Sequence, residues 1–393
     1  MTLDVAALRR QTPGCAHVTH FNNAGAALMP RPVLDAVIDH LRLESEIGGY
    51  EAQARERERI EGVYASAAAL IHAAPEEIAI AESATRAWEM AFYAIPLKPG
   101  DRVLTGVAEY ASNYLAMLQV SRRTGAEIVV IPDDEHGQIS LEALARALDE
   151  RVKVVALTHV PTSGGLVNPA AEVGRIARGT GAVYLLDACQ SAGQMPLDVE
   201  ALGCDVLTAA SRKYLRGPRG LAFLYVRRTL VETLEPPLID NHAARLTGLH
   251  GYAWRDDARR FEHWERNVAG VLGLGAAIDY ARGVGLEGIW ERVRMLGERL
   301  RSALSELPGV AVRDAGAVRC GIVTFTVEGV AAGEVRRSLG DRRINVSTAL
   351  RAETRLDMET RGLPDLVRAS VHYYNTEEEL ASLVQGVTAL GGR

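Results

Sequence analysis

The sequence predicts an α/β protein: a mostly parallel β-sheet sandwiched by helices, with a smaller α+β domain on its C-terminal side. Between residues 78 and 226, short apolar runs alternate with segments of helical spacing, which implies right-handed crossovers between parallel strands. The run at 182–186 is apolar without alternation, as expected of a strand that is buried on both faces. The 393 residues, 48% of them hydrophobic, suffice for a large core and more than one domain.

Apolar spacing and turn residues predict the individual elements. Strands of the main sheet are expected at 78–81, 102–105, 127–131, 152–157, 182–186, 205–207 and 221–226. Helices are expected at 3–10, 31–46, 51–72, 86–95, 140–149, 169–179, 265–283, 286–306, 331–340 and 376–390. Strands near 309–313, 320–327, 345–347 and 367–372 complete the C-terminal part.

These elements group into two predicted domains. We expect a large domain at 15–265 and a small domain at 266–393, with residues 1–14 packed on the small one. The segment 229–262 is rich in Pro, His, Arg and Trp, so we expect it to be irregular and to reach a partner subunit.

Charge and cysteine content limit the possible partners. A formal charge of −6 and a pI near 6.0 argue against nucleic acid or an anionic membrane as the main partner. The four cysteines have no metal-like spacing and no pattern of a disulfide framework, so we expect no metal site. Without an apolar leader or a stretch of transmembrane length, the sequence is typical of a cytoplasmic protein.

An acid and an amine follow two strands of the predicted sheet. Asp187 ends the strand at 182–186, and Lys213 follows the strand at 205–207. Carboxyl ends of parallel strands meet at a ligand crevice, and this pair suits pyridoxal phosphate: the amine forms a Schiff base and the acid keeps the pyridine nitrogen protonated. Only three of the 44 basic residues are lysines, which is consistent with codon bias but also with a need for an amine at 213.

Three further stretches stand where a cofactor site is expected. Residues 83–85 open a helix, whose free N–H groups suit a phosphate, although simple N-capping explains them as well. Tyr110, at a strand exit, either stacks on a cofactor ring or packs in the core. The small residues and paired asparagines of 20–30 suggest backbone that passes close to the mouth of a site.

Three motifs resemble a known family. They are LLDACQSAGQMPLDV, SRKYLRGPRG and HVPTSGGLVNP, and the likeness extends from FNNAGAALMP to RASVHYYNTEEEL. The chain resembles the fold-type I pyridoxal phosphate enzymes of aminotransferase class V, which include cysteine desulfurases, isopenicillin N epimerase-like proteins and hercynylcysteine sulfoxide lyases. The resemblance implies the fold-type I architecture, the cofactor, an amino-acid substrate and a homodimer.

The resemblance also implies a role for each matched residue. Lys213 is expected to bind the cofactor and to move the Cα proton, Asp187 to pair with the pyridinium, and Gln190 to donate to the phenolic oxygen. Arg368 is expected to bind the substrate carboxylate, for which its planar fork is suited. The remaining assignments are Tyr110, Ala84, Thr85, Thr162 and Ser211 at the cofactor and Asn23 at the substrate. A usual phosphate-binding hydroxyl is replaced by Ala210, and Ser211, Arg212 or Thr208 is expected to substitute for it.

The reaction type depends on a departure from the family. Cysteine desulfurases carry a nucleophilic Cys on a C-terminal loop, and residues 345–352 contain none. This absence disfavours a cysteine desulfurase. Together with the HVPTSGG motif it resembles the hercynylcysteine sulfoxide lyase and epimerase-like branch of the family, which implies a lyase that performs β-elimination at a C–S bond. Aminotransfer to a keto acid and epimerisation stay open, since fold alone does not set the reaction. The intact set of Lys213, Asp187 and Arg368 argues against a catalytically silent binding protein.

Overall fold

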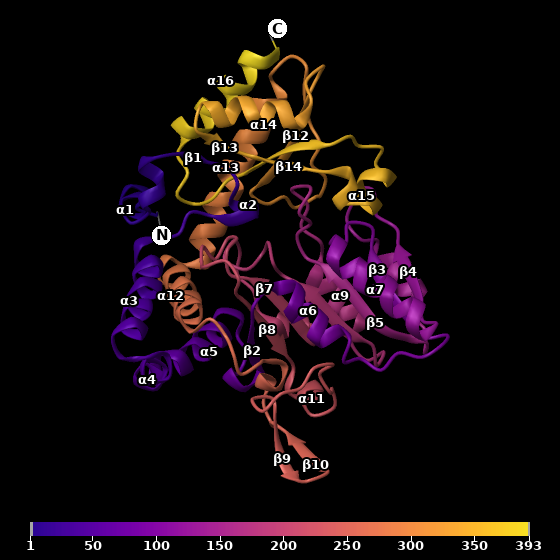
Figure 1. Ribbon diagram of the computed structural model, residues 1–393. Coiled ribbons are helices and arrows are strands. Elements are labelled where there is room, and N and C mark those ends of the chain that lie inside the picture. The colour runs from indigo at the N-terminus through magenta and orange to yellow at the C-terminus, as the bar shows by residue number, and fades with distance from the viewer. Residues whose placement is uncertain (1–2, 392–393) are drawn as a thin grey trace.

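The main sheet of the protein has seven strands, and all seven were predicted. The computed structural model describes residues 3–391 (Figure 1). The strand order is β2-β8-β7-β6-β5-β3-β4, and β8 runs antiparallel to both of its neighbours while the other pairs are parallel. The bounds are β2 (Ile78–Ala81), β3 (Arg102–Gly106), β4 (Glu127–Ile131), β5 (Val152–Thr158), β6 (Val183–Asp187), β7 (Val206–Ala210) and β8 (Ala222–Val226).

Helices cover both faces of this sheet, so its central strands are buried on both sides. Successive residues of a strand point to opposite faces. In β6, Leu185 packs into a core with α6 and α7, whereas Leu186 packs into a second core with α5, α9 and α12. This double burial explains the apolar runs without alternation. The helices are α5 (Arg57–Ile71), α6 (Ala84–Phe92), α7 (Ala111–Thr124), α8 (Leu141–Ala147), α9 (Ala170–Ala177) and α12 (Val268–Val284).

The N-terminal helices lie beside α12 (Figure 1). These are α3 (Arg31–Ile47) and α4 (Gly49–Arg55), which precede α5. The helix predicted at 51–72 is therefore two helices, α4 and α5, which meet at Glu56. The helix α12, which follows the predicted division at residue 265, packs against α3 and α5, which precede it. The packing therefore marks no boundary there, and the division into two domains stays a prediction.

A second, antiparallel sheet forms the C-terminal part, in the order β11-β12-β15-β14. Its strands are β11 (Val310–Val312), β12 (Ile322–Val327), β14 (Ser347–Ala349) and β15 (Leu366–Ser370). The helices of this part are α13 (Leu286–Ser305), α14 (Ala332–Asp341), α15 (Arg355–Thr360) and α16 (Glu377–Gly391). Leu3 and Leu8, beside and within α1 (Val5–Arg10), pack against its core, and β1 (Thr19–His20) pairs with β13 (Ile344–Asn345). The N-terminal segment thus joins the C-terminal part.

The segment 229–262 contains a β-hairpin that was not predicted. Strands β9 (Ala244–Gly248) and β10 (Gly251–Trp254) pair antiparallel and project from the rest of the chain at the bottom of Figure 1. The short helix α11 (Arg228–Val231) precedes the hairpin. Within residues 3–391, none of the helices combines the length and the apolar character that a membrane span requires.

Candidate active site

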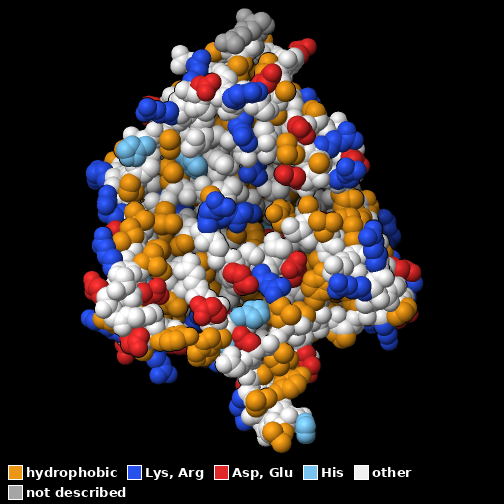
Figure 2. Space-filling view, viewed as in Figure 1, with side chains coloured by type: hydrophobic (Ala, Val, Ile, Leu, Met, Phe, Trp, Pro, Cys, Tyr) orange, Lys and Arg blue, Asp and Glu red, His pale blue; other side chains and the backbone are white. Residues whose placement is uncertain are grey.

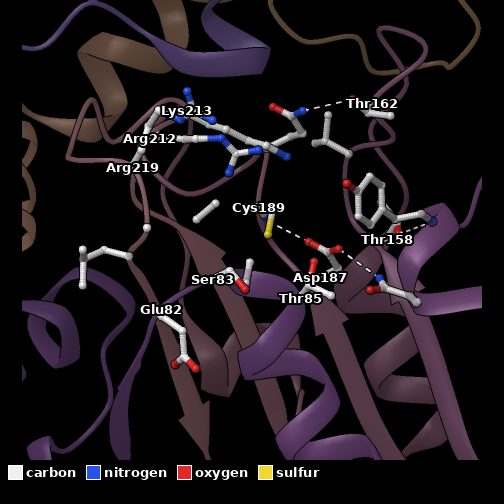
Figure 3. Close-up of a pocket in the computed structure, with 18 residues that line it drawn as sticks. Glu82, Ser83, Thr85, Thr158, Thr162, Asp187, Cys189, Arg212, Lys213 and Arg219 are labelled. Atoms are coloured by element: carbon white, nitrogen blue, oxygen red, sulfur yellow. Dashed lines mark hydrogen bonds between the residues drawn. The ribbon is translucent and has the colours of Figure 1, made fainter. Parts of the chain in front are cut away.

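A cavity of about 270 Å³ opens at the carboxyl ends of the parallel strands (Figure 3). Its lining comes from the loops after β2, β3, β5, β6 and β7, which all end at this edge of the sheet. The polar and small side chains that line it include Ser83, Ala84, Thr85, Tyr110, Asn113, Thr158, Thr162, Asp187, Cys189, Gln190, Arg212 and Lys213. Seven of the predicted cofactor residues are therefore brought together in one cavity.

Lys213 supplies the amine of this cavity. Its side chain is buried, and its Nζ lies 5.8 Å from the centre of the Tyr110 ring. Burial lowers the pKa of Lys213, because removal from water disfavours the charged ammonium; Cys189 and Asp187 oppose the effect. A buried amine with a lowered pKa loses its proton more readily, which is what a Schiff-base lysine requires.

Asp187 is held at the end of β6 by hydrogen bonds to both carboxylate oxygens. Its Oδ1 accepts from the backbone N–H of Cys189 at 2.9 Å, and its Oδ2 accepts from Asn113 Nδ2 at 3.0 Å (Figure 3). Each carboxylate oxygen can accept more than one hydrogen bond, so Asp187 keeps acceptor capacity on the side that lines the cavity. Asp187 therefore presents a carboxylate in a fixed position to the cavity.

Behind Asp187 lies a buried carboxylate that the sequence reasoning did not single out. Glu109 accepts hydrogen bonds from Asn113 Nδ2 at 2.9 Å and from Thr158 Oγ1 at 2.5 Å. Burial raises the pKa of Glu109, and the nearby charge of Asp187 acts in the same direction. The signal in the sequence was the spacing of Glu109 and Asn113, which brings their side chains to the same side of the chain at the start of α7.

Arg368, on β15 of the second sheet, does not line the cavity itself but contacts Thr162, which does. Its Nη1 donates to Thr162 Oγ1 at 2.6 Å and to the Thr162 carbonyl at 3.1 Å, and its Nη2 donates to Asn22 Oδ1 at 3.4 Å. Its Nε has no hydrogen-bond partner among the described residues. Gln190 Nε2 also meets Thr162 Oγ1, at 3.4 Å, so the arginine and the cavity are linked through Thr162.

Asn23, predicted at the substrate, points elsewhere. Its Nδ2 donates to the Ser370 carbonyl at 2.6 Å, and its Oδ1 accepts from the Tyr374 hydroxyl. The side chain is fully buried in this network and does not line the cavity. Its neighbour Asn22 is the asparagine that contacts Arg368.

A helix start and two arginines contribute to the lining of the cavity. Ser83 caps α6 by accepting from the Arg86 N–H at 3.1 Å, and Ala84 and Thr85 form the first turn. Arg212 and Arg219 line the same cavity. The free N–H groups of a helix start and the two guanidinium groups suit a phosphate.

Ser211, predicted to replace the missing hydroxyl at Ala210, does not line this cavity. Its Oγ faces Gly217, where an added Cβ would lie 2.1 Å away, and it has no hydrogen-bond partner within the described chain. The loop at 345–352, which includes β14, contains no Cys.

Comparisons with known proteins agree on the family. The family model described as Aminotransferase class-V matches residues 19–383. A probable cysteine desulfurase of Methanothermobacter thermautotrophicus is 29% identical over 98% of both chains, and one of Halalkalibacterium halodurans is 30% identical over 94% of this chain and 92% of its own. Among solved structures, the apo cysteine desulfurase from Thermococcus onnurineus superposes with a TM-score of 0.92 at 28% identity, covering 100% and 99% of the two chains.

These comparisons correct the predicted reaction. The prediction of a C–S lyase, with cysteine desulfurase disfavoured, is wrong, because the relatives matched over nearly their whole length are named cysteine desulfurases. The prediction gave one missing Cys in a loop more weight than the likeness of the whole chain. The predicted fold class and family are confirmed. From its sequence, its fold and the residues gathered in this cavity, the chain belongs to the aminotransferase class V family.

Proposed function

We propose that this protein is a pyridoxal phosphate-dependent enzyme that removes sulfur from cysteine, the reaction for which its relatives are named. The observation that carries the proposal is the position of Lys213, a buried amine with a lowered pKa, in the same cavity as the fixed carboxylate of Asp187. The names of relatives that match along the whole chain support the choice of cysteine as substrate.

The cavity residues fit pyridoxal phosphate. Lys213 lines the cavity, and Gln190 Oε1 is a buried acceptor without a hydrogen-bond partner among the described residues. We propose that Lys213 and Asp187 hold the two ends of the ring, that Tyr110 covers one face, and that Ala84, Thr85 and Arg212 hold the phosphate. When bound, the cofactor supplies an aldehyde for the amino group and a ring that accepts electrons from Cα.

The substrate carboxylate is assigned to Arg368. Thr162 and Asn22 hold its two terminal nitrogens, and its Nε keeps a donor without a described partner. A planar guanidinium in a fixed position binds a carboxylate with two parallel hydrogen bonds. The carboxylate thereby places the Cα proton near Lys213 Nζ, which takes up and returns it.

The released sulfur passes to a thiol. In the proposed reaction the C–S bond of cysteine and the S–H bond of an acceptor thiol break, and a C–H bond and an S–S bond form. The products are alanine and a persulfide; carbon is reduced and sulfur oxidised, so no outside oxidant or reductant is needed. Cys189, Cys204 and Cys320 are buried, Cys15 is half-buried against the core of the C-terminal part, and residues 345–352 contain no Cys, so we propose that the acceptor is a thiol from outside the chain.

The test is a product analysis. The holoprotein, incubated with L-cysteine and an excess of a small dithiol, is expected to form alanine and sulfide in equal amounts over many turnovers. Lys213→Ala is expected to form no alanine, whereas Lys98→Ala, which changes an exposed lysine, keeps the wild-type rate. Pyruvate and ammonia in place of alanine, or no product from the wild-type holoprotein, would overturn the proposal.

We further propose a cytoplasmic homodimer. The projecting hairpin exposes Leu246 and Leu249, with exposed fractions of 83% and 96%, and Tyr252. Orange side chains gather on this hairpin in Figure 2. Large apolar side chains on a projecting element favour a protein contact, and we assign that contact to a second copy of this chain. The free state of the four cysteines is consistent with the cytoplasmic location.

A further inference from the structure

We propose that Glu109 is a second buried carboxylate of the active site, which acts through Asn113 to keep Asp187 oriented toward the cofactor's ring nitrogen and adds a second negative group behind Asp187. This inference rests on the proposed cofactor. Glu109 does not line the main cavity, whereas Asn113 and Asp187 do, and Asn113 connects it to Asp187. It is therefore a positioning residue.

Burial raises the pKa of Glu109, and hydrogen bonds to its carboxylate oppose that effect. Its Oε1 accepts from the Tyr110 N–H at 2.7 Å, Asn113 Nδ2 at 2.9 Å and Thr158 Oγ1 at 2.5 Å, and its Oε2 accepts from Thr105 Oγ1 at 2.8 Å. The backbone N–H and the amide can only donate. Thr158 Oγ1 also accepts from the Tyr110 N–H at 3.2 Å, so its own proton is free for Glu109. Donors on both oxygens stabilise a carboxylate against the cost of burial.

Asn113 connects the two carboxylates through a single nitrogen. Its Nδ2 carries two N–H groups, one directed to Glu109 Oε1 at 2.9 Å and the other to Asp187 Oδ2 at 3.0 Å. The amide thus has an acceptor on each side, and it cannot rotate without losing both bonds. The side-chain position of Asp187 is fixed by this bridge and by the Cys189 N–H on its other oxygen.

The negative charge of Glu109 then adds to that of Asp187 at the cofactor's ring nitrogen. Two negative groups on one side of a buried site raise the proton affinity of a basic nitrogen bound beside them. Two other acidic groups of the described chain lie near Glu109. Asp187, on β6, acts on its pKa, and Asp133 lines a small cavity together with Glu109. Burial raises the pKa of Asp133 to about 6. The cations Lys213 and Arg212 belong to the main cavity, beyond Asp187. Glu109 thereby helps Asp187 hold the ring nitrogen protonated.

The test uses Glu109→Gln, which keeps the shape and removes the charge. The holoprotein is loaded with cofactor labelled with ¹⁵N in the ring, and the nitrogen chemical shift is measured. We expect the wild type to show a protonated nitrogen and Glu109→Gln a shift toward the unprotonated value. Its kcat is expected to fall about tenfold or more while KM stays within about threefold, because proton affinity at the ring and not substrate binding is changed.

Two further variants complete the design. Asn113→Ala leaves the charge of Glu109 but removes the bridge, and it is expected to move the nitrogen shift in the same direction; it serves as the test if Glu109→Gln does not fold. Glu127→Gln, an exposed carboxylate on β4, is the matched control. A wild-type nitrogen shift in both Glu109→Gln and Asn113→Ala would overturn the inference. A wild type that binds no cofactor would instead overturn the proposed function.

Discussion

Burial decides the chemistry of single residues in this cavity. Burial lowers the pKa of Lys213 and also that of Arg368, but a guanidinium keeps its proton in proteins whereas an amine can lose it. The identity of Lys213 and Asp187 could be predicted from the sequence, because each follows a recognisable strand. The hydrogen bond from Asn113 to Asp187 could not, because these residues meet only once strands β3 and β6 lie in one sheet.

Arg368 gives the first prediction at this scale. Arg368→Lys is expected to raise KM for the amino-acid substrate about ten- to a hundredfold, because one ammonium cannot replace a fork that Thr162 and Asn22 hold in place and charged hydrogen bonds contribute about 1.5–3 kcal/mol each. Steady-state kinetics measure the effect. Arg355→Lys, on the exposed face of α15, is the control. An unchanged KM in Arg368→Lys would contradict the assignment of the substrate carboxylate to Arg368.

Neighbouring residues were the hardest to assign from the sequence. Asn22 and Asn23 are adjacent, but only Asn22 faces Arg368, because one step along the chain turns a side chain away. In the same way, Ser211 points at Gly217 while Arg212 lines the cavity. Sequence patterns locate a loop at a site but do not say which side chain of the loop enters it.

Among the strands, the buried ones could be predicted from the sequence and those of the exposed hairpin could not. The seven strands of the main sheet were recognisable because burial on both faces leaves continuous apolar runs. The hairpin was not, because four of the five residues of β9 are exposed and carry no apolar alternation. The break between α4 and α5 at Glu56 also lacks a glycine or proline that would mark it.

The hairpin provides a prediction at this scale. The protein is expected to have twice its chain mass of 42.4 kDa in solution, and a double variant Leu246→Asp and Leu249→Asp to shift toward the monomer, because charges replace apolar contacts at the proposed interface. Light scattering after size exclusion measures both masses. Val318→Asp, an exposed position outside the hairpin, is expected to leave the dimer intact. A monomeric wild type that retains the cofactor would contradict the dimer.

At the scale of the whole molecule, the site joins segments that are distant in sequence. The cavity lies at one edge of the main sheet, and Arg368 approaches it from the second sheet beside Asn22 of the N-terminal segment. The fold class could be predicted because strand and helix periods persist over long stretches. The approach of Arg368, on the second sheet, to the cavity of the main sheet could be predicted only through the family resemblance, because no local sequence pattern indicates it.

The most direct test of the central claim is where the cofactor attaches. The holoprotein is reduced with borohydride, digested and mapped by mass spectrometry; the chain has only Lys98, Lys153 and Lys213, so the attachment site is read without ambiguity. The cofactor is expected on Lys213 alone, since this lysine lines the cavity and the other two do not. A cofactor fixed to Lys98 or Lys153, or to no lysine, would contradict the proposed active site.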